Sequence, residues 1–137
     1  MLKTMADKKR RPVPAKTAPE RRSPCPVACS LDLLGDRWTL LVVRDLIFGR
    51  SRFKDFTASP ERIPTNILSD RLARLLRHRI VDRIVDRIVD RIPAEDGTKR
   101  LAYRLTAKGV ALRPVLEAMR DWGLAHAPGS RAALVPA

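Results

Sequence analysis

The chain of 137 residues has few aromatic residues, few acidic residues and only two cysteines. Its six aromatic side chains are too few to stack along a single-stranded nucleic acid. Two cysteines cannot form a disulfide framework, so we expect reduced thiols in a cytoplasmic protein. No run approaches the roughly 18 apolar residues of a membrane span, so no membrane partner is expected. The length fits one domain with tails.

The shortage of acidic residues leaves a formal net charge of +13, from 28 Lys and Arg against 15 Asp and Glu. Residues 1–24 contain eight of these basic residues, two acidic residues and four prolines, with hardly any large apolar side chain. This composition predicts a disordered basic arm over 1–24. The excess of positive charge indicates a polyanionic partner, with nucleic acid as the first expectation.

Helical periodicity begins at Cys25, and Gly35 and Gly49 are expected to close the first two helices. Ser51 is expected to cap a short third helix. A fourth helix is expected over about 65–78, because leucines recur on one face and polar residues on the other.

A tandem repeat follows the fourth helix, and the expanded segment occupies 79–92, with three copies of Arg-Ile-Val-Asp. As a strand the repeat has no apolar face, whereas as a helix its Ile and Val residues form one stripe. A return strand is expected over 100–105, and its six residues can pair only with the last copy, roughly 88–93. We therefore expect the first two copies to extend the fourth helix by two turns. A longer unpaired ribbon is the alternative.

Thr106 is expected to cap a last helix through about Ala125, in which Pro114 produces a kink or a change of helix. The order of helix, helix, short helix, helix, hairpin and helix is that of a winged helix-turn-helix domain over 25–126. A flexible tail is expected over 127–137. The predicted fold class is mainly α with a small β-hairpin (α+β).

Short motifs in a fixed order carry a more specific resemblance. They are Cys25-Pro26-Val27, Leu33-Leu34-Gly35-Asp36-Arg37-Trp38-Thr39, Leu46 to Gly49, Arg52-Phe53, Ile63-Pro64-Thr65-Asn66-Ile67-Leu68, Arg71-Leu72 and Thr106-Ala107-Lys108-Gly109. Over about 25–123 the chain resembles the HxlR-type family of bacterial transcriptional regulators. The resemblance implies a homodimer that binds double-stranded DNA, with dimer contacts from the first and last helices and a recognition helix beginning near Thr65.

Two departures from the family pattern concern the repeat. The family usually has Gly where Arg79 stands, at the end of the recognition helix. It also has a single strand segment where this chain has three copies, so eight residues look like a tandem expansion.

The predicted DNA contacts form two groups. Polar residues early on the exposed face of the fourth helix are candidates for base contacts, since Asn pairs with adenine edges and Ser or Thr contacts several bases. Helix capping is the alternative for Thr65 and Asn66. Basic residues are candidates for phosphate contacts or, at the hairpin tip, for the minor groove. The first group is Thr65, Asn66, Ser69 and Asp70, and the second is Arg52, Lys54, Arg71, Arg74, Lys99 and Arg100.

Cys25 is a candidate redox sensor, because a thiol at a helix start beside Arg21 and Arg22 is expected to favour the reactive thiolate. The resemblance implies the same role, since some members of the family sense electrophiles or oxidants through a Cys at this position. A plain capping or half-buried thiol is the alternative. Cys29 stands four residues later, and the chain offers too few further ligands for zinc. No cofactor is expected, and the effector is unidentified.

The leading prediction is a sequence-specific transcriptional regulator that binds double-stranded DNA, with a wing over about 88–105 beside the recognition helix. The alternative is a non-specific basic nucleic-acid-binding protein driven by the arm. An enzyme is not expected, because Cys25-x-x-x-Cys29 lacks the two-residue gap of common redox motifs. The sequence also has no nucleophile–base pair and no phosphate-cradling glycine loop.

Overall fold

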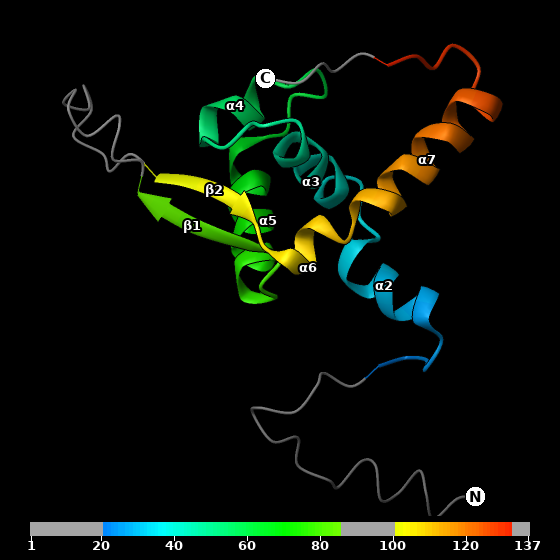
Figure 1. Ribbon diagram of the computed structural model, residues 1–137, viewed down its shortest axis with the longest axis horizontal. Helices are drawn as coiled ribbons and strands as arrows, with labels where there is room; N and C mark the ends of the chain where they lie inside the picture. Colours follow the sequence, from blue (N-terminus) through cyan, green and yellow to red (C-terminus); the bar gives the residue numbers. More distant parts are fainter. Residues whose placement is uncertain (1–20, 86–100, 133–137) are drawn as a thin grey trace, which may run out of the picture. The chain divides into compact units, whose positions relative to one another are not determined.

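The computed structural model describes residues 21–85 and 101–132 (Figure 1). The chain divides into two compact units, 1–33 and 34–137. The elements are α2 (Pro26–Leu34), α3 (Thr39–Ile47), α4 (Phe53–Thr57), α5 (Thr65–Arg77), β1 (Val81–Val85), β2 (Leu101–Leu105), α6 (Ala107–Val110) and α7 (Arg113–His126). This order confirms a mainly helical winged helix-turn-helix fold with one small hairpin.

The core of the second unit gathers apolar side chains from its helices and from the hairpin. The buried apolar residues are Val42, Val43, Leu46, Phe56, Ile63, Leu68, Leu72, Leu75, Ile80, Val81 and Ala102. Leu68, Leu72 and Leu75 recur at the spacing of one helix face, so the polar face of α5 is turned outward. The Tyr103 ring packs edge-on against Phe56, with 6.3 Å between ring centroids, which joins β2 to α4.

The fourth helix ends before the repeat, because the chain enters the left-handed conformation at Arg79, where φ is 58°. The N–H of Arg79 donates to the Leu76 carbonyl at 3.1 Å, and the N–H of Ile80 donates to the Leu75 carbonyl at 2.9 Å. These two bonds form the Schellman motif that ends many helices. The expectation that the repeat extends this helix was wrong. Ile80 and Val81 are β-branched, and they are buried where β1 begins.

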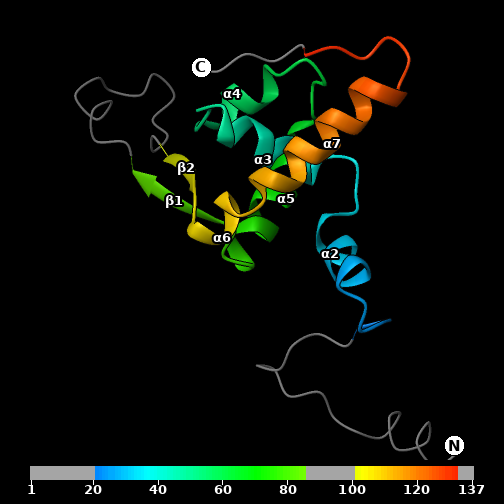
Figure 2. The ribbon, with the colours of Figure 1, turned by 45° about the vertical axis from the view of Figure 1, so that its right-hand side comes forward.

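The hairpin is antiparallel, and its register runs from Val81 opposite Leu105 to Val85 opposite Leu101. The first copy of the repeat therefore pairs with the return strand, and the expectation that only the last copy can pair was wrong. The reason is that burial of the first Ile-Val pair starts the strand directly after α5. Residues 86–100, which hold the rest of the repeat, lie outside the described residues. In both views β1 and β2 lie beside α5, β2 leads into α6, and the opposite ends of the two strands point away from α6 (Figures 1 and 2).

The return strand leads into α6 and α7, two helices joined by a short link. Thr106 caps α6 as expected, since its Oγ1 accepts the N–H of Gly109 at 3.2 Å. The Thr106 hydroxyl also lies 2.7 Å from the Arg79 carbonyl oxygen, to which it donates. Pro114 stands in the first turn of α7, so it marks a change of helix rather than a kink. A Cβ at Gly109 would lie 2.3 Å from the Ile80 carbonyl oxygen, so only glycine fits this contact with the strand.

Several predicted segments fall largely beyond what the structure describes. Only residues 21–24 of the predicted arm and 127–132 of the predicted tail are described. Within the described ranges, 21–85 and 101–132, no helix is long and apolar enough to cross a membrane.

Candidate nucleic-acid interface

The polar face of α5 carries the residues predicted to contact bases. Thr65, Asn66, Ser69 and Asp70 are all exposed. Their spacing places them on one face over the first two turns, and we call this set the α5 patch. In the described structure no side chain caps the helix at its N-cap residue, Pro64. Pro64, rather than Thr65 or Asn66, occupies the N-cap position of this helix.

The helix-turn-helix is completed by α4 and the loop that leads into α5. Its predicted phosphate contacts differ in exposure, since Lys54 is exposed and Arg52 is half-buried. The Asp55 carboxylate accepts the backbone N–H of Arg52 at 3.0 Å and of Ser51 at 3.3 Å. The expectation that Ser51 caps this helix was wrong, because the N-cap residue is Arg52 and the Asp55 side chain reaches back to it.

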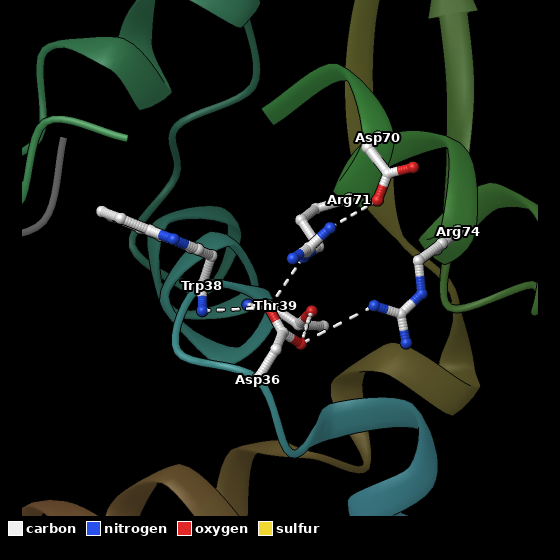
Figure 3. Close-up of polar contacts among 6 residues, drawn as sticks. All are labelled: Asp36, Trp38, Thr39, Asp70, Arg71 and Arg74. Atoms are coloured by element: carbon white, nitrogen blue, oxygen red, sulfur yellow. Dashed lines mark hydrogen bonds and ion pairs between the residues drawn. The ribbon is translucent and has the colours of Figure 1, made fainter. Parts of the chain in front are cut away.

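Asp36 links the start of α3 to α5 (Figure 3). Its carboxylate accepts the backbone N–H of Trp38 at 3.1 Å and of Thr39 at 3.2 Å, and it also accepts the Thr39 hydroxyl. From α5, Nε of Arg71 donates to Oδ2 of Asp36 at 2.7 Å. Nη1 of Arg74 lies 3.8 Å from Oδ1 of Asp36. One carboxylate therefore satisfies the first turn of α3 and contacts two arginines of α5.

The charges in this cluster stabilise one another. Burial alone would raise the pKa of Asp36, but hydrogen bonds from Thr39, Arg71 and Trp38 hold that pKa well below its usual range. The hydrogen bond to Asp36 in turn raises the pKa of Arg71. Nη1 of Arg71 also donates to Asp70, so two carboxylates share one guanidinium.

A second ion-pair cluster fixes the loop that leads into α5. Arg44 of α3 donates to both carboxylate oxygens of Glu61, at 2.9 and 2.8 Å, and to Oδ1 of Asp45 at 2.8 Å. The buried Asp45 accepts the Ser59 hydroxyl at 2.6 Å. Burial would lower the pKa of Arg44, but its bonds to Glu61 and Asp45 raise it, and the bond from Arg44 lowers the pKa of Glu61. The loop that leads into α5 is thus tied to α3.

The basic residues predicted to contact phosphates differ in their ion-pair partners and in whether the structure describes them. Arg71 and Arg74 are directed toward Asp36, as Figure 3 shows. Lys99 and Arg100 lie outside the described residues. At the described part of the wing, the exposed Arg104 lies 4.0 Å from Asp82 of β1.

The sequence pattern of the HxlR-like helix-turn-helix family matches residues 33–130. The chain belongs to this family. YodB, an HTH-type transcriptional regulator of Bacillus subtilis, is 33% identical over 99 residues, which cover 72% of this chain and 81% of YodB. YdeP, an uncharacterised HTH-type transcriptional regulator of the same organism, is 31% identical over 99 residues, which cover 72% of this chain and 71% of YdeP.

Solved structures agree with this membership of the HxlR-like family. The reduced form of YodB superposes with a TM-score of 0.58 at 32% identity, over 80% of this chain and all (100%) of that chain. The redox regulator HypR in its oxidised form superposes with a TM-score of 0.62 at 30% identity, over 74% of this chain and 96% of that chain. The resemblance read from the sequence motifs is therefore confirmed.

In this HxlR-like chain, Cys25 is exposed and directly precedes α2. The Ser23 hydroxyl oxygen accepts the N–H of Cys25 at 3.1 Å, and the Cys25 carbonyl accepts the N–H of Cys29 at 2.9 Å. Nε of Arg22 donates to Asp32 at 2.7 Å, so this arginine is paired along α2. The Cys25 thiol is exposed rather than half-buried in the described structure. Across the described ranges no group of three His, Cys, Asp or Glu side chains is placed to hold a metal ion.

Two helices of the HxlR-like chain present apolar side chains to solvent. On α7, Val115, Met119 and Trp122 recur at the spacing of one helix face, and Trp122 is 67% exposed. On α2, Val27 and Leu31 are exposed one turn apart. Large apolar side chains are therefore exposed on one face of α7 and on α2.

The importance of Asp36 was missed by reasoning from the sequence. The available signal was an aspartate just before α3, since Asp side chains often accept backbone N–H groups two or three residues later. Its partner Arg71 is 35 residues away in the sequence, so the ion pair could not be inferred from local spacing.

Proposed function

We propose that this HxlR-like chain regulates transcription by binding a specific sequence in double-stranded DNA, with α5 in the major groove. The exposed α5 patch on a winged helix-turn-helix is the observation that carries the proposal. Asn66 can pair with an adenine edge, Thr65 and Ser69 can contact several bases, and Asp70 can accept from cytosine. A bacterial regulator of this kind acts in the cytoplasm, on the chromosome, and not as an enzyme.

Contacts to the DNA backbone would flank this patch. Arg52 and Lys54 precede α5, and Lys99 and Arg100 belong to the segment between β1 and β2, where a wing reaches the backbone or the minor groove. Such contacts position the protein on the duplex without reading its sequence.

A gel-shift titration against genomic fragments, including the chain's own promoter, tests the proposal. Asn66→Ala is expected to cost about 1–3 kcal/mol on the preferred sequence and little on others, because a base contact is lost. Lys54→Ala, the control, is expected to weaken binding to all fragments about equally. Uniform weak binding of the unmodified protein to every fragment would contradict sequence-specific recognition.

A homodimer is the assembly that we propose, with the apolar faces of α7 and α2 as its contacts. The exposed Trp122 and Met119 of α7 and Leu31 of α2 support it, since burial of such side chains drives association. A two-fold dimer would place two copies of α5 on half-sites about one or more helical turns apart. Sedimentation of the unmodified protein and of Trp122→Arg tests this. A monomer at micromolar concentration, or an unchanged dimer in the variant, would contradict it.

Cys25 is proposed to make DNA binding responsive to oxidants or electrophiles. Its exposure supports this, as does similarity to YodB, solved in quinone-bound and diamide-treated forms, and to HypR, solved in oxidised and reduced forms. Diamide is expected to release DNA from the unmodified protein and from Cys29→Ser, but not from Cys25→Ser. Equal release from Cys25→Ser would refute the role of this thiol.

Non-specific binding by the basic arm is a second candidate, favoured by the eight basic and two acidic residues of 1–24. Deletion of 1–24 distinguishes binding by the arm from binding by the winged domain. If affinity collapses equally on all sequences, the arm is the binder. If sequence preference survives the deletion, the winged domain is the part that binds DNA.

A further inference from the structure

Asp36 ties α5 to α3 through Arg71, a residue 35 positions away in the sequence. Asp36 accepts two backbone N–H groups of the first turn of α3 and, on its other side, the guanidinium of Arg71 at 2.7 Å. Arg71 is part of α5 and also donates to Asp70, a member of the α5 patch. A continuous chain of bonds therefore runs from α3 to the surface proposed to meet DNA (Figure 3).

We propose that Asp36 is a positioning residue for DNA recognition: by holding Arg71, it fixes the rotation of α5 about its own axis and orients Asp70 within the α5 patch. The inference rests on the proposed function, since it concerns how that patch meets the bases.

Asp36 gives α5 a directional contact in addition to its apolar packing. The buried face of α5 is made of Leu68, Leu72 and Leu75, and apolar packing does not fix orientation as a charged hydrogen bond does. Side-chain ends lie about 5–6 Å from a helix axis, so a rotation of about 10° moves them by about 1 Å. A site held about 1 Å too loosely loses its function.

The geometry favours this role for Arg71 over a phosphate contact. Its side chain is largely covered, at 21% exposed, and two carboxylates share its guanidinium. Asp36 remains ionised at neutral pH, since its partners hold its pKa well below the usual range. A phosphate would have to displace a pre-formed, charge-assisted pair.

The test compares two duplexes. One is selected by the unmodified protein from a randomised pool, and the other is the same duplex with its bases shuffled. Asp36→Asn removes the charge but keeps an oxygen that can accept the N–H groups of α3. Asp121→Asn is the matched control, because it makes the same change of charge at an exposed side chain of α7 that pairs with its neighbour Arg120. Affinities are measured where circular dichroism shows each variant folded.

Asp36→Asn is expected to weaken binding to the selected duplex by about tenfold or more, the size of a lost base contact, and to leave binding to the shuffled duplex nearly unchanged. Asp121→Asn is expected to leave the ratio of the two affinities unchanged. If Asp36 only stabilises the fold, the ratio stays constant in both variants, which overturns the proposal. If the unmodified protein does not distinguish the duplexes, the proposed function itself fails.

Arg71 provides an independent check, and it applies even if Asp36→Asn does not fold. Arg71→Gln and Arg71→Lys are both expected to lower the same ratio, since lysine keeps the charge but cannot join two carboxylates with a planar fork. The double variant Asp36→Asn/Arg71→Gln is expected to bind no more weakly than the weaker single variant. If Arg71→Gln instead weakens both duplexes equally and lowers the salt dependence by one phosphate, Arg71 is a backbone contact and the proposal is wrong.

Discussion

Replacement of Arg79 by glycine is expected to stabilise the protein, because Arg79 occupies a conformation that arginine resists. Its φ of 58° lies in the left-handed region, which costs an L-residue with a side chain about 1–2 kcal/mol. Glycine adopts it without that penalty but loses more backbone freedom on folding, worth about 0.5–1 kcal/mol. The net expected gain in the free energy of unfolding is about 0.5–1 kcal/mol. The bonds at this site are kept, because they are made by backbone atoms and by Thr106.

Arg77→Gly is the matched control for this prediction. Arg77 is also an exposed arginine, two positions earlier, but it is the last residue of α5 and has helical geometry. Glycine there is expected to lower the free energy of unfolding by up to about 1 kcal/mol. Urea unfolding at one fixed protein concentration measures both variants, since the proposed homodimer would make stability depend on concentration. If Arg79→Gly is no more stable than the unmodified protein, or if both variants lose stability equally, the account of the helix end is refuted.

Three further predictions concern the same unit. Gly109→Ala is expected to lower the free energy of unfolding by about 1–3 kcal/mol, because its Cβ would lie 2.3 Å from the Ile80 carbonyl oxygen, whereas Gly123→Ala, with open space around it, is expected to raise that energy by up to about 1 kcal/mol. Thermal unfolding measures both variants, and equal shifts would contradict the close contact between Gly109 and the Ile80 carbonyl. Thr106→Ala removes the cap of α6 and is expected to cost about 1 kcal/mol in urea unfolding, so an unchanged midpoint would argue against the cap. The folded-state pKa of Asp36 is lowered, so the stabilisation by its carboxylate is present above about pH 4, its unfolded pKa, and is lost as the pH falls. Asp36→Asn is therefore expected to flatten the acid side of a plot of urea midpoint against pH, and an equally steep loss in the variant would contradict the ion pair.

Much of this fold follows from local sequence signals. The leucine spacing of α5 predicts both its buried face and the α5 patch. Gly49, with φ of 97°, ends the second helix as expected, and Thr106 and Pro114 act at the positions predicted for them. These signals succeed because caps, left-handed glycines and helical periodicity depend on residues close in sequence.

The secondary structure of the repeat could not be predicted from local sequence signals. Its Ile and Val residues are compatible with either a helical stripe or a strand, so pattern alone cannot choose between them. Tertiary contacts decide: Ile80 and Val81 are buried, and Gly109 lets α6 approach the Ile80 carbonyl. The link from Asp36 to Arg71 is likewise invisible locally, because folding alone brings together residues that lie 35 positions apart.

Selection of duplexes from a randomised pool, carried out in parallel with the unmodified protein and with Asn66→Ala, tests the central claim most directly. We expect the unmodified protein to enrich a two-fold repeated sequence. We expect Asn66→Ala to relax the preference at one position in each half-site and to leave the others intact. Enrichment of no sequence by the unmodified protein, or of the same sequence with undiminished preference by the variant, would contradict recognition of DNA by the exposed face of α5.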